Sequence, residues 1–93
     1  MLEYHAAFYK DPEAEGWYVV SVLDFPGVNT QGRTPREARF MVKDSLKLMA
    51  ECYLDEGQML PMPNSKASDS EARSVEKIRL EILVHLTNGI RPR

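Results

Sequence analysis

The residues of this sequence that could carry out chemistry are few and widely spaced. Its two histidines, His5 and His85, lie near opposite ends of the chain, and Cys52 is its only cysteine. These residues show none of the spacings that gather His and Cys around a zinc ion. Both histidines also stand on the opposite parity to the apolar residues around them, so we expect both to be exposed. The sequence therefore predicts no metal site and no catalytic histidine.

Carboxylates are the other groups that could support catalysis, as ligands of the divalent metals that nucleases use. In the predicted strands they are limited to Glu3, Glu76 and Glu81, with Asp24 at a turn. The first two strands offer no inward-facing acid at their centres. A serine triad could be assembled only by arbitrary choice of its members. We therefore predict no catalytic residue, no cofactor and no enzymatic activity.

Three arginines, Arg33, Arg36 and Arg39, flank the start of a predicted helix, where free backbone amides also attract anions. They could hold a phosphate there, although solvated arginines are the commoner case. The whole chain carries a net charge of −2, which argues against binding nucleic acid through bulk charge. Direct DNA binding is therefore not expected.

The elements that would position these residues belong to one small domain. The chain has 93 residues, of which 43% are hydrophobic and 28% charged, as in an ordinary globular protein. A single cysteine can form no internal disulfide, which favours a reducing compartment. The first residues lack the pattern of a signal peptide, and the longest uncharged stretch, residues 16–23, is too short to span a bilayer. We expect a cytoplasmic protein without membrane contact, whose thin core favours a homodimer or tetramer.

The first third of the chain predicts an antiparallel meander. Apolar and polar side chains alternate over residues 1–10 with the period of a strand, and residues 17–23 are almost wholly β-branched or aromatic, as in an inner strand. A loop of hairpin length joins them. Pro26 and Gly27 end the second strand, and residues 28–31 are predicted to form a short third strand.

A capping box marks the start of one long helix, predicted over residues 35–56. Thr34 can accept from the amide of Glu37, whose carboxylate can reach back to the amide of the N-cap residue, and Pro35 suits the first helical position. Cys52 is expected to be a buried structural thiol and not a reactive one. The apolar stripe predicted for this helix comprises Ala38, Met41, Val42, Leu48, Met49, Cys52 and Tyr53.

After the helix, the prolines of residues 59–63 predict an extended apolar segment that lies over the domain. Residues 64–74 contain no large apolar side chain and are predicted to be a flexible linker. Residues 75–86 alternate apolar and polar side chains, which favours a strand, with a helix as the alternative. The predicted fold class is α+β, in the order β-β-β-α-β. An antiparallel three-stranded meander packs on one long helix in a single domain, residues 1–93, and the last strand is added to the sheet or shared between subunits.

The turn after the second strand and the helix start together resemble the HicB-like antitoxin family. The family pattern is a D-x-P-G, then a T-x-G, then a T-x-E-E-A helix start, and here Arg36 replaces the first glutamate of the last motif. An aromatic G-W-Y precedes the pattern and a G-x-x-x-P-x-P segment follows it, so the resemblance covers about residues 2–86. The motif positions, which we expect to be mainly structural, are Asp24, Pro26, Gly27, Thr30, Gly32, Thr34, Glu37 and Ala38.

This resemblance implies a partial ribonuclease H-like fold without catalysis, and a partner of the HicA type, a small basic RNA-cleaving toxin. Many family members continue into a DNA-binding domain, and because this sequence stops at Arg93, direct operator binding is not expected. An acidic loop with Asp11, Glu13 and Glu15 beside Trp17 could mask the basic surface of such a toxin. A solvated hairpin is the alternative reading of that loop.

Three classes of function remain at this point. The first is an antitoxin, or a stand-alone relative of one, that binds a HicA-like toxin. The second is a non-catalytic homo-oligomeric interaction module without a toxin partner, and the neighbouring gene would distinguish it from the first. The third is an enzyme of ribonuclease H descent, which a nuclease assay with magnesium or manganese would test.

Overall fold

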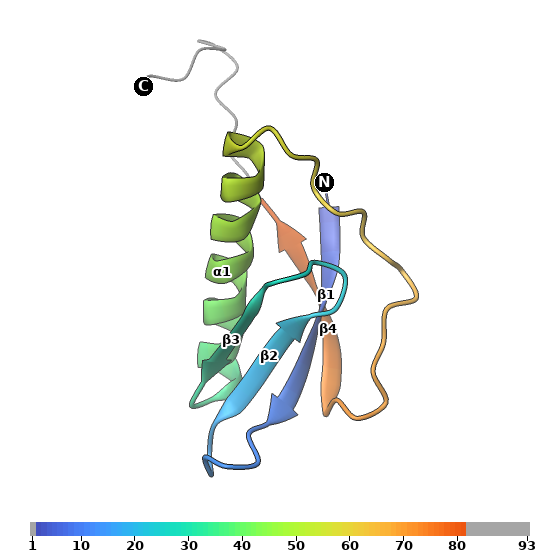
Figure 1. The fold of residues 1–93 in the computed structure, drawn as a ribbon. Helices are drawn as coiled ribbons and strands as arrows, with labels where there is room; N and C mark the ends of the chain where they lie inside the picture. Colours follow the sequence, from blue (N-terminus) through green and yellow to red (C-terminus); the bar gives the residue numbers. More distant parts are fainter. Residues whose placement is uncertain (1, 82–93) are drawn as a thin grey trace.

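The computed structural model describes residues 2–81, which form one helix and four strands (Figure 1). The order confirms the α+β class. The predicted extension of the last strand through residues 82–86, and with it His85, lies outside the described residues. In sequence order the elements are β1 (Leu2–Lys10), β2 (Tyr18–Val22), β3 (Asn29–Gly32), α1 (Pro35–Asp55) and β4 (Ser74–Leu80).

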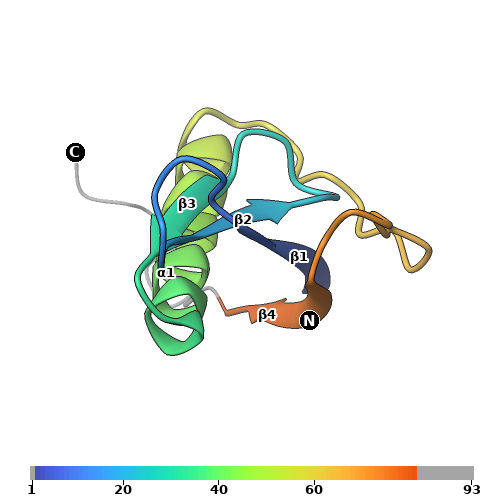
Figure 2. The ribbon, with the colours of Figure 1, turned by 90° about the horizontal axis from the view of Figure 1, so that it is seen from below.

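The strands form one antiparallel sheet in the order β3-β2-β1-β4. β1 is central, with Tyr9 opposite Val19 of β2 and Tyr4 opposite Ile78 of β4. The last strand is therefore added to the sheet of its own chain. Seen from below, α1 lies on one side of this sheet, and the connection from α1 to β4 lies on the other (Figure 2).

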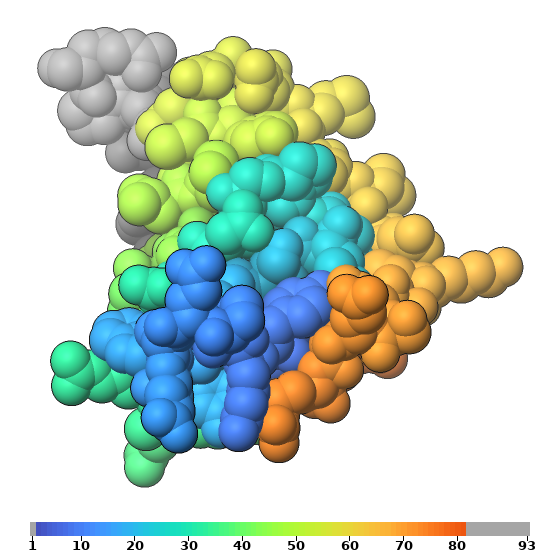
Figure 3. All heavy atoms as spheres, turned by 60° about the horizontal axis from the view of Figure 1, so that its bottom comes forward, coloured from blue at the N-terminus to red at the C-terminus, as the bar shows by residue number. Residues whose placement is uncertain are grey.

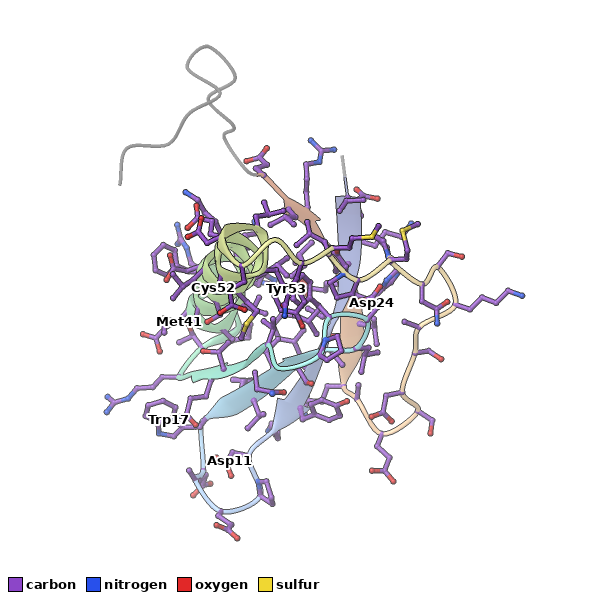
Figure 4. The ribbon with its side chains drawn as sticks, turned by 45° about the horizontal axis from the view of Figure 1, so that its top comes forward. Asp11, Trp17, Asp24, Met41, Cys52 and Tyr53 are labelled. Atoms are coloured by element: carbon purple, nitrogen blue, oxygen red, sulfur yellow. The ribbon has the colours of Figure 1, made fainter. Side chains whose placement is uncertain are left out.

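The helix packs on the sheet through four residues at intervals of four, which align along one side of a helix. The predicted stripe was partly wrong, because Met41 and Leu48 are 37% and 62% exposed and Cys52 is exposed as well. These three lie roughly 100–140° around the helix from the centre of the buried side. Figure 4 shows Met41 and Cys52 on the outer flank of α1 and Tyr53 on the side of the sheet. The buried ridge consists of Ala38, Val42, Leu46 and Ala50.

The start of α1 is capped as predicted, with one difference. The hydroxyl oxygen of Thr34 accepts from the amide of Glu37 at 3.0 Å. The Glu37 carboxylate accepts from the amide of Arg33 at 2.7 Å, one residue before the N-cap. Neither amide has a hydrogen-bond partner within the helix, so either can donate to the Glu37 carboxylate.

The connection after α1 is held against β1 at several points. Tyr4 donates its hydroxyl to the Pro61 carbonyl at 2.6 Å, and Tyr9 donates to the Asp69 carboxylate at 2.6 Å. As predicted, residues 59–63 are not helical, and Leu60 packs against the core. The flexibility of residues 64–74 stays a prediction.

Candidate functional site

The side chain of Asp24, the first motif residue, is buried, and both of its carboxylate oxygens accept hydrogen bonds. Its side chain is 3% exposed. One carboxylate oxygen accepts from the backbone amide of His5 at 2.8 Å. The other accepts from Nδ1 of the His5 ring at 2.8 Å and from the amide of Asn64 at 3.0 Å. Asp24 therefore ties the turn after β2 to the central strand and to the segment that follows the helix.

His5 is buried, at 8% exposure, so the expectation of an exposed histidine was wrong. It does stand on the strand face opposite the core residues Tyr4 and Ala6. That face is covered at this point by the turn that carries Asp24 and by the chain at Asn64. Burial depends on segments far along the sequence, which strand parity cannot detect.

The same contacts set the charge of Asp24. Burial by itself would raise the pKa of this carboxyl, but the hydrogen bonds from the Asn64 and His5 amides and from the His5 ring outweigh it and lower the pKa. The group is therefore a carboxylate at neutral pH, surrounded by donors. These hydrogen bonds join the turn after β2, the central strand β1 and the segment after the helix.

The turn after Asp24 places an aromatic side chain in the core. Phe25 is fully buried, and its ring meets those of Tyr4 and Tyr53 edge to face at 5.1 and 5.2 Å between centroids. Gly27 has a φ of +90°, which only glycine adopts readily. The sequence analysis did not predict that Phe25 is a core residue, although a large aromatic side chain between the motif aspartate and proline indicates burial.

Two further motif positions bring β3 against the helix start. A Cβ atom at Gly32 would lie 2.6 Å from the backbone nitrogen of Ala38, which is itself fully buried. Thr30, two residues earlier on β3, pairs with Val20 of β2. The motif therefore shapes the junction between turn, edge strand and helix.

The acidic loop, residues 11–16, lies at the same end of the molecule as the start of α1 (Figure 1). Glu13 and Glu15 are exposed. The Asp11 carboxylate accepts from the Glu13 amide at 2.9 Å, and the Asp11 amide donates to the Trp17 carbonyl at 3.0 Å, which closes the loop. In the space-filling view the loop, in blue, projects at the surface (Figure 3).

The three arginines at the helix start do not assemble into an anion site. The Arg39 guanidinium makes a bidentate pair with Glu76 of β4 at 2.8 and 2.9 Å. The Arg33 guanidinium carbon lies 5.1 Å from the centre of the half-buried Trp17 ring, in a cation–π contact. Arg36 is exposed. Arg33 and Arg39 thus serve contacts on opposite sides of the helix.

Within residues 2–81, no three His, Cys, Asp or Glu side chains form a group that could hold a metal ion. α1, the one helix of that described range, is not long and apolar enough to cross a membrane.

The fold is that of HicB N-terminal domains. The N-terminal domain of the Burkholderia pseudomallei antitoxin HicB superposes with a TM-score of 0.71 at 20% identity, over 87% of this chain and 100% of that one. The longer antitoxin HicB of the same organism superposes with a TM-score of 0.73 at 22% identity, over 87% of this chain and 63% of that one.

The sequence identifies the family. Residues 3–88 match the HicB_like antitoxin of bacterial toxin-antitoxin system, and the chain belongs to this family. The antitoxin HicB of Escherichia coli K12 is 38% identical over 53 residues, which are 57% of this chain and 38% of the relative. A Thermoplasma acidophilum relative, UPF0150 protein Ta0767, is 31% identical over 65 residues, 70% of this chain and 91% of the relative. The chain thus spans 38% of the length of the E. coli antitoxin.

Proposed function

We propose that this chain is an antitoxin that binds a small basic HicA-type RNA-cleaving toxin and masks its RNA-binding surface. Membership of the HicB-like antitoxin family, matched over residues 3–88, is the observation that carries the proposal. The chain would act by binding and not by catalysis. Because such a toxin acts on cellular RNA, the proposal places the complex in the cytoplasm.

The acidic loop is the contact surface that we propose. Asp11, Glu13 and Glu15 bring three negative charges to one tip of the molecule, and Trp17 adds a large aromatic group whose orientation is supported by Arg33. A surface that binds RNA phosphates is positively charged, so these carboxylates can occupy the positions that phosphates would take. Trp is also frequent among residues that anchor interfaces.

Replacement of the three acids by serine tests this contact. Asp11→Ser, Glu13→Ser and Glu15→Ser together are expected to weaken binding to the small basic protein encoded by the adjacent gene by about tenfold or more at low salt. The loss should shrink as salt is raised, because salt screens exposed charges. Serine at position 11 keeps an oxygen that can accept from the Glu13 amide.

A matched control removes three exposed acids outside the loop: Glu3→Ser, Glu71→Ser and Glu81→Ser. It changes the net charge equally and should bind within about twofold of the wild type, since these residues lie outside the proposed contact. Undiminished binding by the loop variant would rule out the loop as the contact surface.

The second candidate is a non-catalytic homo-oligomeric interaction module without a toxin partner. β4 stands at the edge of the sheet, where a second copy could pair. Self-association as a dimer or tetramer and the lack of direct DNA binding stay predictions, which light scattering and a DNA-binding assay with operator DNA at low salt would test.

A further inference from the structure

Three large apolar side chains of α1 point away from the sheet. Phe40 is 69% exposed, Leu48 62% and Met41 37%. With a turn of about 100° per residue, all three fall on the side of α1 that faces away from the buried ridge. Exposed apolar groups gathered on one side of a small domain are typical of an interaction surface.

Acidic side chains alternate with these apolar groups. The helical period places three acids at intervals of seven residues among them, within about 100° of the helix circumference. We call this surface the outer stripe. Among the basic residues of α1, Arg36 and Lys47 border the stripe on the side of Phe40, whereas Arg39 and Lys43 lie further round, on the flank toward β4. The outer stripe consists of Glu37, Phe40, Met41, Asp44, Leu48 and Glu51.

The outer stripe continues onto the acidic loop. Glu37, at the start of the stripe, accepts from the amide of Arg33 at 2.7 Å. The Arg33 guanidinium carbon lies 5.1 Å from the Trp17 ring centre, and the Trp17 carbonyl closes the loop by accepting from Asp11. The stripe and the loop are thus neighbours at this end of the molecule, with the exposed Arg33 between them.

We infer that the outer stripe docks a basic amphipathic segment of another protein, in which Lys or Arg side chains alternate with apolar ones. This inference rests on the proposed function and names the chemistry of the toxin segment involved. Opposite charges at this spacing pair with Glu37, Asp44 and Glu51, while apolar groups between them cover Met41 and Leu48.

Other occupants fit the stripe less well. A second copy that docked by the same stripe would place carboxylates against carboxylates, which is unfavourable. Anionic lipid headgroups would repel the stripe for the same reason. A wholly apolar partner would bury three carboxylates without counter-charges, at a large free-energy cost.

The test is isothermal titration calorimetry of the full chain with the small basic protein encoded by the adjacent gene. Met41→Ser with Leu48→Ser is expected to weaken binding about tenfold or more, because buried apolar anchors dominate interfaces. The control is Met59→Ser with Met62→Ser, which removes two apolar groups that are 90% and 81% exposed outside the helix. The control is expected to bind within about twofold of the wild type.

A charge variant keeps the test decisive if the apolar variant folds poorly. Asp44→Lys with Glu51→Lys is expected to weaken binding about tenfold or more at low salt. Its control, Glu71→Lys with Glu81→Lys, makes the same charge change away from the stripe. Circular dichroism and thermal melting of each variant establish that the fold is retained.

The outcomes separate this inference from the proposed function. If the wild type binds and the folded stripe variants bind equally well, the docking surface is wrong and the antitoxin proposal stands. If the wild type does not bind, both fall. Stripe variants that reduce the mass of a wild-type oligomer without changing toxin affinity would assign the stripe to a second copy, and would also overturn the inference.

Discussion

Asp24 is the residue on which the arrangement of three distant segments depends. Its carboxylate receives three hydrogen bonds, from the amide and ring of His5 and from the amide of Asn64, which is 40 residues further along the chain. Removing one partner of a buried polar group leaves the others unsatisfied, which costs more than the bond itself contributes. The motif aspartate therefore matters for stability, independently of any partner.

We predict that Asp24→Ala lowers the free energy of unfolding by about 2–4 kcal/mol, because the substitution leaves the part-buried donors of His5 and the amide of Asn64 without their acceptor. Urea denaturation followed by circular dichroism measures this. Asp11→Ala serves as the control, because Asp11 caps only an exposed amide, and should cost about 1 kcal/mol or less. Equal losses for the two variants would contradict the structural role of Asp24.

The Asp24 pKa also predicts how stability responds to acid. The folded pKa is lowered from the ordinary value of 3.8, so between the two values the unfolded chain binds a proton that the folded chain does not. The stabilisation is complete above the unfolded pKa and is lost as the pH falls through the folded pKa. The Glu76 carboxyl acts in the same direction, because its hydrogen bond from Arg39 lowers its pKa.

Urea midpoints measured from pH 7 down to pH 3 test this dependence. The wild type should lose its advantage over Asp24→Asn as the pH falls below about 4, because Asp24 is then protonated in the unfolded chain. A difference between wild type and variant that stays constant over this range would show that the Asp24 charge does not contribute.

At the scale of the elements, the junction between β3 and α1 sets the position of the helix. Gly32 allows the close approach, since a Cβ atom there would lie 2.6 Å from the Ala38 nitrogen and 2.9 Å from its Cα. Backbone atoms cannot move aside as the end of a flexible side chain can. The buried ridge, which begins and ends with alanines, extends this close packing along the helix.

Gly32→Ala is therefore predicted to destabilise the fold by about 2–3 kcal/mol, as overpacking of a tight contact does. Gly16→Ala is the matched control, because Gly16 has a φ of +87° but open space around its Cβ position. Its cost should be about 1 kcal/mol, from backbone strain alone. Thermal unfolding compares the two, and a smaller loss at Gly32 than at Gly16 would contradict the role given to this junction.

Local signals in the sequence predicted the elements well. Thr34 and Pro35 marked the helix start, and the helix ends at Asp55, one residue before the predicted end. The buried face of the helix was harder to predict. Leu46 and Ala50 were missed, Ala50 because alanine gives a weak hydrophobic signal, while Met41 and Leu48 were expected to be buried because they are apolar. Which face is buried depends on how closely the sheet approaches, and sequence periodicity does not contain that information.

At the scale of the whole molecule, the acidic loop and the start of the helix lie at the same end (Figure 1). The sequence showed the acidic loop, because Asp11, Glu13 and Glu15 are adjacent in it. The outer stripe could not be found in this way, since Met41 and Leu48 had been assigned to the core. Only the structure places the stripe beside Trp17, through Arg33 and Glu37.

Over the described residues, all four strands of the sheet come from one chain, and β4 pairs with the central strand β1. Covering the last strand therefore does not require a second subunit. A second copy could instead pair with the outer edge of β4. The surfaces proposed for a toxin and for a second copy are thus different ones.

The most direct test of the antitoxin proposal is to titrate the full chain into the small basic protein encoded by the adjacent gene while RNA cleavage is monitored. We expect stoichiometric binding, with cleavage of a model RNA abolished at one equivalent. Continued cleavage in the presence of excess folded chain, with no heat of binding, would contradict the proposal that this protein neutralises such a toxin.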